Sequence, residues 1–264
     1  MSLTVQQVLD RLIEPVGLLE RTVDTLKCGR PDAEVRKVAV VMTATYSAIE
    51  QAIREGVDLI VTHEPTYFNH LDEHDWIADD LVLLKKRELI EQSGIAIFRF
   101  HDYIHRYRPD GILAGMLRKL EWVEYLSADE RNLLIFPSER NFTVRSIVTH
   151  LKDKLGLKGM MVVGDPELPV SRVGLMPGAS GGKSHMNYLN SKEIDLLIVG
   201  ETNEWETNEY VRDAADMGLR KALIVTGHQK SEEAGMQYAQ EQLKAAFPKL
   251  EVIYLECPTA GQLL

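Results

Sequence analysis

Short apolar runs alternate with amphipathic segments along the first half of the chain. The apolar runs are rich in Val, Ile and Leu and have the length of buried strands, whereas the segments between them have helical spacing. Gly56 and Gly94 follow the two helical segments, at the position where a helix commonly ends. The predicted strands are 37–42, 58–62 and 95–100, and the predicted helices are 46–55 and 81–93.

The second half repeats this order of elements. Helices alternating with short β-branched strands are typical of βαβ units, in which parallel or mixed sheets are covered by helices. The pattern therefore predicts an α/β fold. The predicted strands are 160–163, 171–176, 195–199, 222–226 and 251–255, and the predicted helices are 142–155, 205–217 and 231–246.

Two segments repeat one another. Residues 55–65 and 217–228 both run from a helix end through Gly and an apolar strand to Thr and then His. The repetition predicts two related α/β halves with chemistry at the carboxyl ends of their strands, where open α/β sheets bind ligands. No Pro-, Gly- or Ser-rich linker separates the halves. We therefore expect a single two-lobed domain over 1–264, with halves at roughly 1–130 and 131–264.

Composition excludes several classes of protein. The 264 residues carry 30 Lys and Arg against 40 Asp and Glu, a formal charge of −10, and no basic stripe that would favour nucleic acid. The N-terminus lacks a secretory signal, and no apolar stretch approaches the roughly 20 residues of a membrane-spanning helix. Cys28 and Cys257 fit neither a zinc spacing nor a disulfide framework. We expect a cytoplasmic protein that binds neither membranes nor nucleic acid.

Metal-ligating residue types follow three of the predicted strands. His, Glu and Asp gathered at neighbouring strand ends are the ligands of Zn, Mn or Fe. A single strand-end His is more often a surface or hydrogen-bonded residue, so only the joint placement favours a metal site. The remaining histidines are interpreted as structural or solvated. The candidates are His63 and Glu64 after 58–62, His101 and His105 after 95–100, and His228 and Glu232 after 222–226.

Two further segments allow more than one interpretation. Gly178 and Gly182 enclose three residues, not the four of a phosphate-binding loop, so 177–184 is interpreted as a tight turn that permits close backbone approach. Glu201 opens an acidic segment after the strand 195–199. This segment could begin a helix capped by Thr202 or Asn203, or Glu201 could orient a ligand or act as an acid or base.

Five motifs in order resemble the Nif-three-like family, also described as the dinuclear-metal-centre family. The motifs are THEP at 62–65, HxxxH at 101–105, the Gly-rich turn at 178–182, GE at 200–201 and GHQKSE at 227–232. The resemblance implies two related α/β halves with a metal site between them at the carboxyl ends of strands. It also implies a ring-shaped homohexamer, and the chain is too short for the domain that larger members insert.

The resemblance implies two divalent ions, with five residues as their ligands. The family's THHP motif has Glu64 in place of its second His, and the family's HTxxD motif has His105 in place of its Asp. One imidazole and one carboxylate are thus exchanged at positions that bind the same ion in the family, and the equivalent of Glu232 bridges both ions. The implied ligands are His63, Glu64, His105, His228 and Glu232.

The resemblance supports a metal-dependent hydrolase as the leading hypothesis. Family members are described as homologues of the type-2 GTP cyclohydrolase, which suggests a small-molecule substrate such as a nucleotide or phosphoester. In this hypothesis Glu201 is the general base and His101 acts beside the ligands or as a proton shuttle. The alternative is a non-enzymatic, metal-binding ring scaffold or regulatory protein, which a closed site without an open coordination position would favour.

Overall fold

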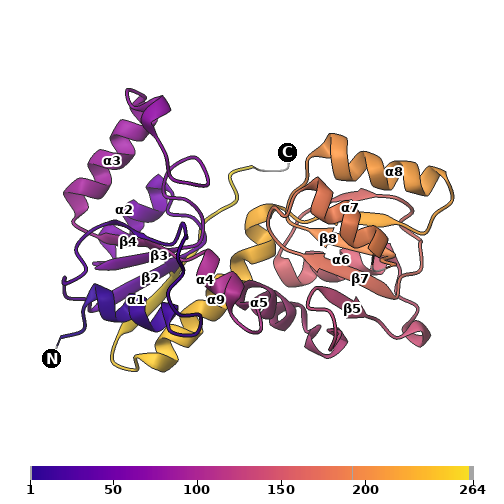
Figure 1. Cartoon of the computed structure of the whole chain (residues 1–264), viewed down its shortest axis with the longest axis horizontal. Coiled ribbons are helices and arrows are strands. Elements are labelled where there is room, and N and C mark those ends of the chain that lie inside the picture. Colours follow the sequence, from indigo (N-terminus) through magenta and orange to yellow (C-terminus); the bar gives the residue numbers. More distant parts are fainter. Residues whose placement is uncertain (1, 192, 262–264) are drawn as a thin grey trace. The chain divides into compact units, whose positions relative to one another are not determined.

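The computed structural model of the protein describes residues 2–191 and 193–261. It consists of two compact units (Figure 1). The first unit contains the chain up to Gly111 together with Met236–Pro258, and the second contains Ile112–Gly235 and the residues after Pro258. The C-terminal segment belongs to the first unit because residues 251–255 form a strand that pairs with residues 37–41 of the first sheet.

The first unit is built on a mixed five-stranded sheet with the order β1-β4-β3-β2-β10. Strands β4, β3, β2 and β10 are parallel, and only the edge strand β1 is antiparallel to its neighbour. The strands are β1 (Leu26–Cys28), β2 (Lys37–Val41), β3 (Leu59–Thr62), β4 (Ala96–Arg99) and β10 (Glu251–Leu255). The helices are α1 (Val5–Ile13), α2 (Tyr46–Arg54), η1 (Asp75–Ile77), α3 (Leu81–Ser93) and α4 (Asp102–Arg106).

The second unit has a sheet of the order β5-β7-β8-β9-β6, with both edge strands antiparallel to their neighbours. Its strands are β5 (Leu133–Ile135), β6 (Met161–Val163), β7 (Arg172–Met176), β8 (Leu196–Val199) and β9 (Ala222–Val225). Its helical elements are α5 (Gly111–Leu120), η2 (Val123–Tyr125), η3 (Ser138–Arg140), α6 (Val144–Leu155), α7 (Gly182–Ser191), η4 (Glu204–Asn208) and α8 (Glu209–Asp216). The division between the units falls within α9 (His228–Ala246).

Helices cover both faces of the second sheet. Alternate side chains of β8 explain this, since Leu196 and Ile198 join one buried cluster with α5 and α6. Leu197 and Val199 join a second buried cluster, with residues of α7 and α8. A strand that is buried on both faces needs an unbroken apolar run, and that is why the strands were recognisable from the sequence.

The two units repeat the same arrangement of strands. In each, an antiparallel strand, three parallel strands and the helices between them follow in the same order. Asp58, before β3, accepts the backbone N–H groups of Arg36 and Lys37 at 2.8 and 3.0 Å. Asp195, before β8, likewise accepts from two consecutive backbone N–H groups, at 2.9 and 3.0 Å. Strand β3 is therefore equivalent to β8, not to β9 as the repeated strand–Thr–His segments had suggested.

Most predicted elements are confirmed, with small changes at their ends. All eight predicted strands are present, each within one residue at either end, and the helix predicted at 81–93 is α3 itself. Among the α-helices and strands, α1, α4, α5, α7, β1 and β5 were not predicted from the sequence. The predicted helix 205–217 is divided into a π-helical turn, η4, and α8. Helix α9 begins at His228 and not at Ser231.

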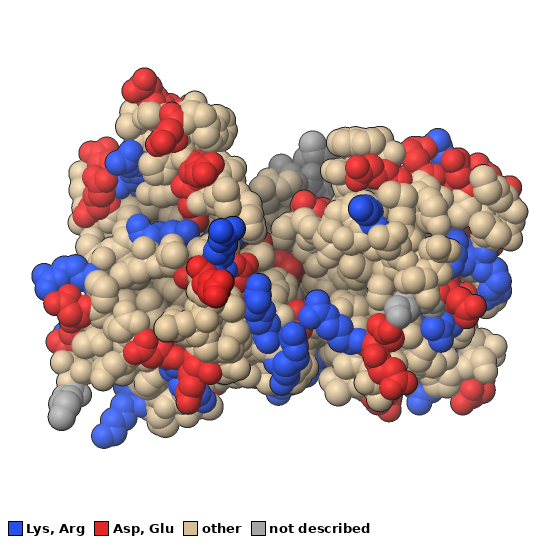
Figure 2. Space-filling model, viewed as in Figure 1, with Lys and Arg blue, Asp and Glu red and all other residues tan. Residues whose placement is uncertain are grey.

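Surface charge and hydropathy agree with the composition. Basic and acidic side chains are interspersed on the face shown in Figure 2. Ion pairs between such side chains include Lys37–Glu55, with Nζ and Oε2 3.2 Å apart. Among residues 2–191 and 193–261, every helix is too short or too polar to cross a membrane.

Candidate metal centre

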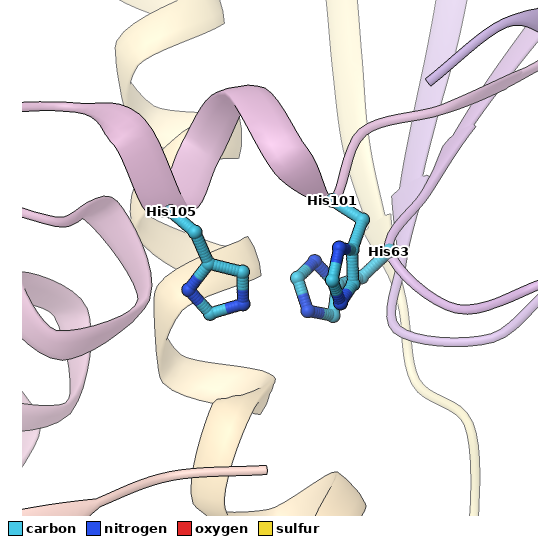
Figure 3. Close-up of side chains that lie close together, drawn as sticks. All are labelled: His63, His101 and His105. Atoms are coloured by element: carbon cyan, nitrogen blue, oxygen red, sulfur yellow. The ribbon is translucent and has the colours of Figure 1, made fainter. Parts of the chain in front are cut away.

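Three histidines of the first unit meet at the carboxyl end of its parallel strands. His63 directly follows β3, while His101 and His105 lie at the two ends of the short helix α4 that follows β4. Because β3 and β4 are adjacent and parallel, their carboxyl ends are neighbours at one edge of the sheet. Figure 3 shows the three rings facing a common space.

The distances within this cluster suit a metal ion. The ring centroids of His63 and His101 are 4.8 Å apart, and that of His105 is 5.2 Å from the first and 5.0 Å from the second. One ligating nitrogen from each ring lies within 4.8 Å of the other two. His63 is fully buried, whereas the side chains of His101 and His105 are 25% and 30% exposed. The cluster is therefore buried on one side and accessible on the other.

Each imidazole is oriented through its Nδ1 atom. The Nδ1 of His63 faces the Phe100 carbonyl oxygen at 3.1 Å, and the Nδ1 of His101 faces Asp102 Oδ1 at 3.0 Å. The Nδ1 of His105 faces Asp110 Oδ2 at 3.1 Å. Since these partners are acceptors, each Nδ1 carries the proton and each Nε2 keeps its lone pair. Histidines that bind metals show this arrangement, so the residues present fit a divalent cation.

Two aspartates hold the loop and helix that carry His101. The Oδ2 atom of Asp102 accepts from the Thr22 hydroxyl at 2.9 Å and from the Val23 N–H at 3.1 Å. Asp24 accepts from the backbone N–H of His101 at 2.8 Å and of Tyr103 at 2.9 Å. The carboxylates thereby fix the start of α4 and the ring at its first position.

Burial sets the protonation state of these groups. It lowers the pKa of His101 to about 4, with a further contribution from the neighbouring His63. Burial also raises the pKa of Asp24. Burial by itself would raise the pKa of Asp102, but the hydrogen bonds from His101 and Thr22 outweigh it and the pKa is lowered. His101 is thus neutral and Asp102 ionised at neutral pH, the states that metal ligation and ring orientation require.

Glu64 lies next to His63 in space as well as in sequence. A carboxylate oxygen of Glu64 and a ring nitrogen of His63 are within 4.8 Å of each other. Strict alternation in an extended segment would place the two side chains on opposite sides. The chain has already left β3 at this point, and the backbone N–H groups of both residues donate to the Met42 carbonyl oxygen at 3.2 and 2.9 Å. Both residues can therefore serve one site.

The second unit also contains a group of acidic and imidazole side chains. His228 begins α9, and its Nε2 atom is 3.0 Å from Glu232 Oε2, one helical turn later. Its Nδ1 atom is 3.1 Å from Glu201 Oε2, so the carboxylate of Glu201 orients this ring as Asp102 orients His101. Glu232 is 3% exposed at its side chain, whereas Glu201 is 57% exposed.

The Gly-rich turn at 178–182 packs directly against this group. This contact agrees with the interpretation of the turn as one that permits close backbone approach. The N–H of Gly178 donates to Ser231 Oγ at 2.9 Å, and a Cβ atom at Gly178 would overlap the Glu232 carboxylate. Ser231 Oγ also donates to the His228 carbonyl oxygen at 2.6 Å, so Ser231 is a residue of the first helical turn and not the N-cap. The turn thus fixes the position of Glu232.

Sequence reasoning overlooked four residues of the first unit. His70, interpreted as solvated, has its ring centroid 5.5 Å from that of His101. The orienting carboxylates also went unrecognised, although Asp102 directly follows a candidate histidine in the sequence. The overlooked residues are His70, Asp24, Asp102 and Asp110.

Two other histidines have the structural roles expected of them. His150 donates from Nε2 to the Leu120 carbonyl oxygen at 2.8 Å and stacks on Trp122. His185 is buried against the Thr207 hydroxyl at 3.0 Å.

In the acidic segment after β8, Asn203 precedes η4 but makes no capping hydrogen bond through its side chain. Thr202 instead donates to Asn208 Oδ1 at 2.8 Å.

Comparison with known families gives a match over nearly the whole chain. The model of the family described as Duf34/NIF3 (NGG1p interacting factor 3) matches residues 5–260. Two curated relatives are both named GTP cyclohydrolase 1 type 2 homolog. The Clostridium acetobutylicum protein is 22% identical over 235 residues, which cover 86% of this chain and 83% of the relative. The Clostridium perfringens protein is 24% identical over 246 residues, covering 88% and 87%.

Solved structures show the same fold at low sequence identity. The Bacillus cereus protein related to NIF3 has a TM-score of 0.77 and 16% identity, with 100% of both chains covered. A hypothetical protein from Staphylococcus aureus has a TM-score of 0.78 and 15% identity, again with 100% of both chains covered. These structures support the α/β architecture of the two units.

Proposed function

The chain belongs to the Duf34/NIF3 family, and from that premise we propose that it is a divalent-metal-dependent hydrolase acting on a nucleotide or phosphoester. The observation that carries the proposal is the shared orientation of four imidazoles. His63, His101 and His105 in the first unit, and His228 in the second, each have Nδ1 against an oxygen acceptor. With the proton on Nδ1, Nε2 is the atom of each ring that would ligate a cation, and in His228 this atom lies 3.0 Å from Glu232 Oε2.

We assign five of the residues as ligands of two divalent ions. Imidazole and carboxylate donors in this ratio suit Zn, Mn or Fe, in contrast to Mg or Ca, which prefer oxygen. Ions of this kind act as Lewis acids on a substrate oxygen and activate water as a nucleophile. The proposed ligands are His63, Glu64, His105, His228 and Glu232.

The chain's own residues would prepare the site in two ways. Asp102 holds the ring of His101 in one tautomer, and Glu201 holds the orientation of the His228 ring, so no reorientation is needed when a ligand arrives. His101 is neutral at neutral pH because of its burial, so its Nε2 atom can accept a proton from a group that binds beside it. The Glu201–His228 contact favours an orienting role for Glu201 over that of general base.

The substrate class rests on the relatives. Their name refers to a GTP cyclohydrolase, an enzyme of nucleotide chemistry. The experiment is a screen of the metal-loaded protein against nucleotides and phosphodiesters, with the double variant His228→Ala, Glu232→Ala as the control. We expect metal-dependent turnover that the control lacks. Bound metal without turnover of any compound would instead favour the non-enzymatic scaffold.

The ring-shaped homohexamer stays a prediction from the family resemblance. Native mass spectrometry of the purified chain measures the number of subunits directly. A hexamer is the expected result, and a monomer at micromolar concentration would contradict it.

A further inference from the structure

His70 is a fourth histidine beside the imidazole cluster of the first unit. It lies in the segment 63–80 between β3 and α3, and its ring centroid is 5.5 Å from that of His101, with the two rings nearly perpendicular. Unlike His63 it is exposed. A ring in this position can meet a molecule that binds at the cluster.

The buried guanidinium of Arg99 fixes the position of His70. Arg99 is fully buried, donates from Nε to the His63 carbonyl oxygen at 3.3 Å, and donates from Nη1 to the His70 carbonyl oxygen. Its Nη2 atom is 3.4 Å from the Nδ1 atom of His70. The same side chain therefore holds both the backbone and the ring of His70 next to His63.

The contact with Arg99 determines the tautomer of His70. Arginine has only donors, so the Nδ1 atom of His70 must be the acceptor and Nε2 must carry the proton. The other three imidazoles of the cluster have the opposite tautomer, with the proton on Nδ1, because their Nδ1 atoms face oxygen acceptors. His70 thus presents an N–H group where His63, His101 and His105 present lone pairs.

The surroundings of His70 favour an anionic partner. Asp72 anchors the same loop, since it accepts from the Tyr67 N–H at 2.7 Å and pairs with Lys27 at 2.9 Å. Arg99 is 3.8 Å from the same carboxylate. Lys27, Arg99 and Asp72 together carry one net positive charge, and Arg99 is the member of this group that contacts His70.

We propose that His70 is not a metal ligand but a hydrogen-bond donor to an anionic oxygen of the substrate, through its Nε2–H group. This inference rests on the proposed function, and it specifies the class of substrate: a phosphate or carboxylate oxygen lies beside the metal ligands. Ligation through Nε2 would require the opposite tautomer, which would set an Nδ1–H group against an N–H group of Arg99.

Two measurements on the full-length, zinc-loaded protein test this role. The first is the tautomer of each histidine from ¹⁵N NMR shifts, for which we expect Nε2–H at His70. The second is the affinity for inorganic phosphate, a simple oxyanion, in the wild type, His70→Ala and His70→Gln. We expect phosphate to bind at least about tenfold more weakly to His70→Ala, the typical effect of losing one hydrogen bond to a charged group. His70→Gln, which keeps an N–H donor, should lose much less.

Zinc content and a control on the same loop complete the experiment. We expect equal zinc per chain in the wild type and both His70 variants, and unchanged phosphate affinity in His74→Ala, whose ring packs on Tyr67 instead. Loss of zinc from His70→Ala, an Nδ1–H tautomer at His70, or phosphate affinity that does not depend on His70 would each overturn the proposal. Failure of the wild type to bind Zn, Mn or Fe would overturn the proposed function itself, and this is measured before the variants are compared.

Discussion

Glu201 and His228 are joined through Oε2 and Nδ1 at 3.1 Å, although 27 residues separate them in the sequence. The Nε2 atom of the same ring is 3.0 Å from Glu232 Oε2, so His228 lies between the two carboxylates. We predict that Glu201→Ala weakens divalent-metal binding about 10- to 100-fold, the usual effect of removing a group that orients a ligand. Competition with a chelator of known affinity measures the change.

Glu204→Ala is the matched control, since this exposed glutamate lies three residues further along the same segment. It should leave metal affinity unchanged. If Glu201→Ala instead abolished turnover while metal affinity stayed at the wild-type value, Glu201 would be the general base and not an orienting residue.

Gly178 provides a test of the Glu232 position without changing a ligand. It has a φ of +71°, and an added Cβ would overlap the Glu232 carboxylate. Gly178→Ala should therefore lower metal affinity by displacing Glu232. Gly218→Ala is the control, because its φ is +78° but a Cβ there would meet no atom within 4 Å.

Both glycine substitutions should cost roughly 1 kcal/mol or more of folding stability, because Ala is strained at positive φ. Only Gly178→Ala should also release metal. Equal metal affinity in the two variants would show that the turn does not position Glu232.

Asp24 should contribute strongly to stability as well as to the site. It is 5% exposed and accepts from the buried N–H groups of His101 and Tyr103. Replacing it with Ala leaves both donors without this acceptor, and we expect a loss of roughly 2–4 kcal/mol in the free energy of unfolding. Urea denaturation measures this loss. Asp32→Ala, at an exposed carboxylate paired with Arg30, should have little effect; a similar loss in both would contradict the role of Asp24.

His185 should make stability depend on pH. Burial lowers its pKa from the ordinary 6.5, although Glu206 opposes the shift. The unfolded chain therefore binds more protons once the pH falls below about 6.5, so stability should decrease as the pH decreases through this range. We expect His185→Gln to show a smaller loss of unfolding free energy between pH 7.5 and pH 5.5 than the wild type, as measured by urea denaturation. Identical pH dependence in the two proteins would contradict this origin.

The strands of the fold were predictable because their signal is local. A strand covered on both faces must be apolar throughout, so runs such as those of β3 and β8 were evident. Helix α7 was not, because Gly, Ser and Asn are poor helix formers and its buried residues His185 and Leu189 are set by packing. The pairing of β10 with β2 joins residues more than 200 positions apart, which no local pattern indicates.

The candidate site was predictable to a similar extent. Residues placed directly at strand ends, such as His63 and His101, could be recognised from sequence because β3 and β4 are neighbours. His70 could not, because its place beside His101 depends on the buried side chain of Arg99. The equivalence of β3 with β8 emerged only from the hydrogen bonds of Asp58 and Asp195.

The central claim is that the chain binds two divalent metal ions through residues that include His228 and Glu232. The most direct test is inductively coupled plasma mass spectrometry of three purified proteins. These are the wild type, the double variant that combines His228→Ala with Glu232→Ala, and the control Glu233→Ala. Glu233 is a neighbouring carboxylate that pairs with Lys230. We predict about two ions of Zn, Mn or Fe per chain in the wild type and in Glu233→Ala, and loss of bound metal from the double variant. A full metal complement in the double variant would contradict the account.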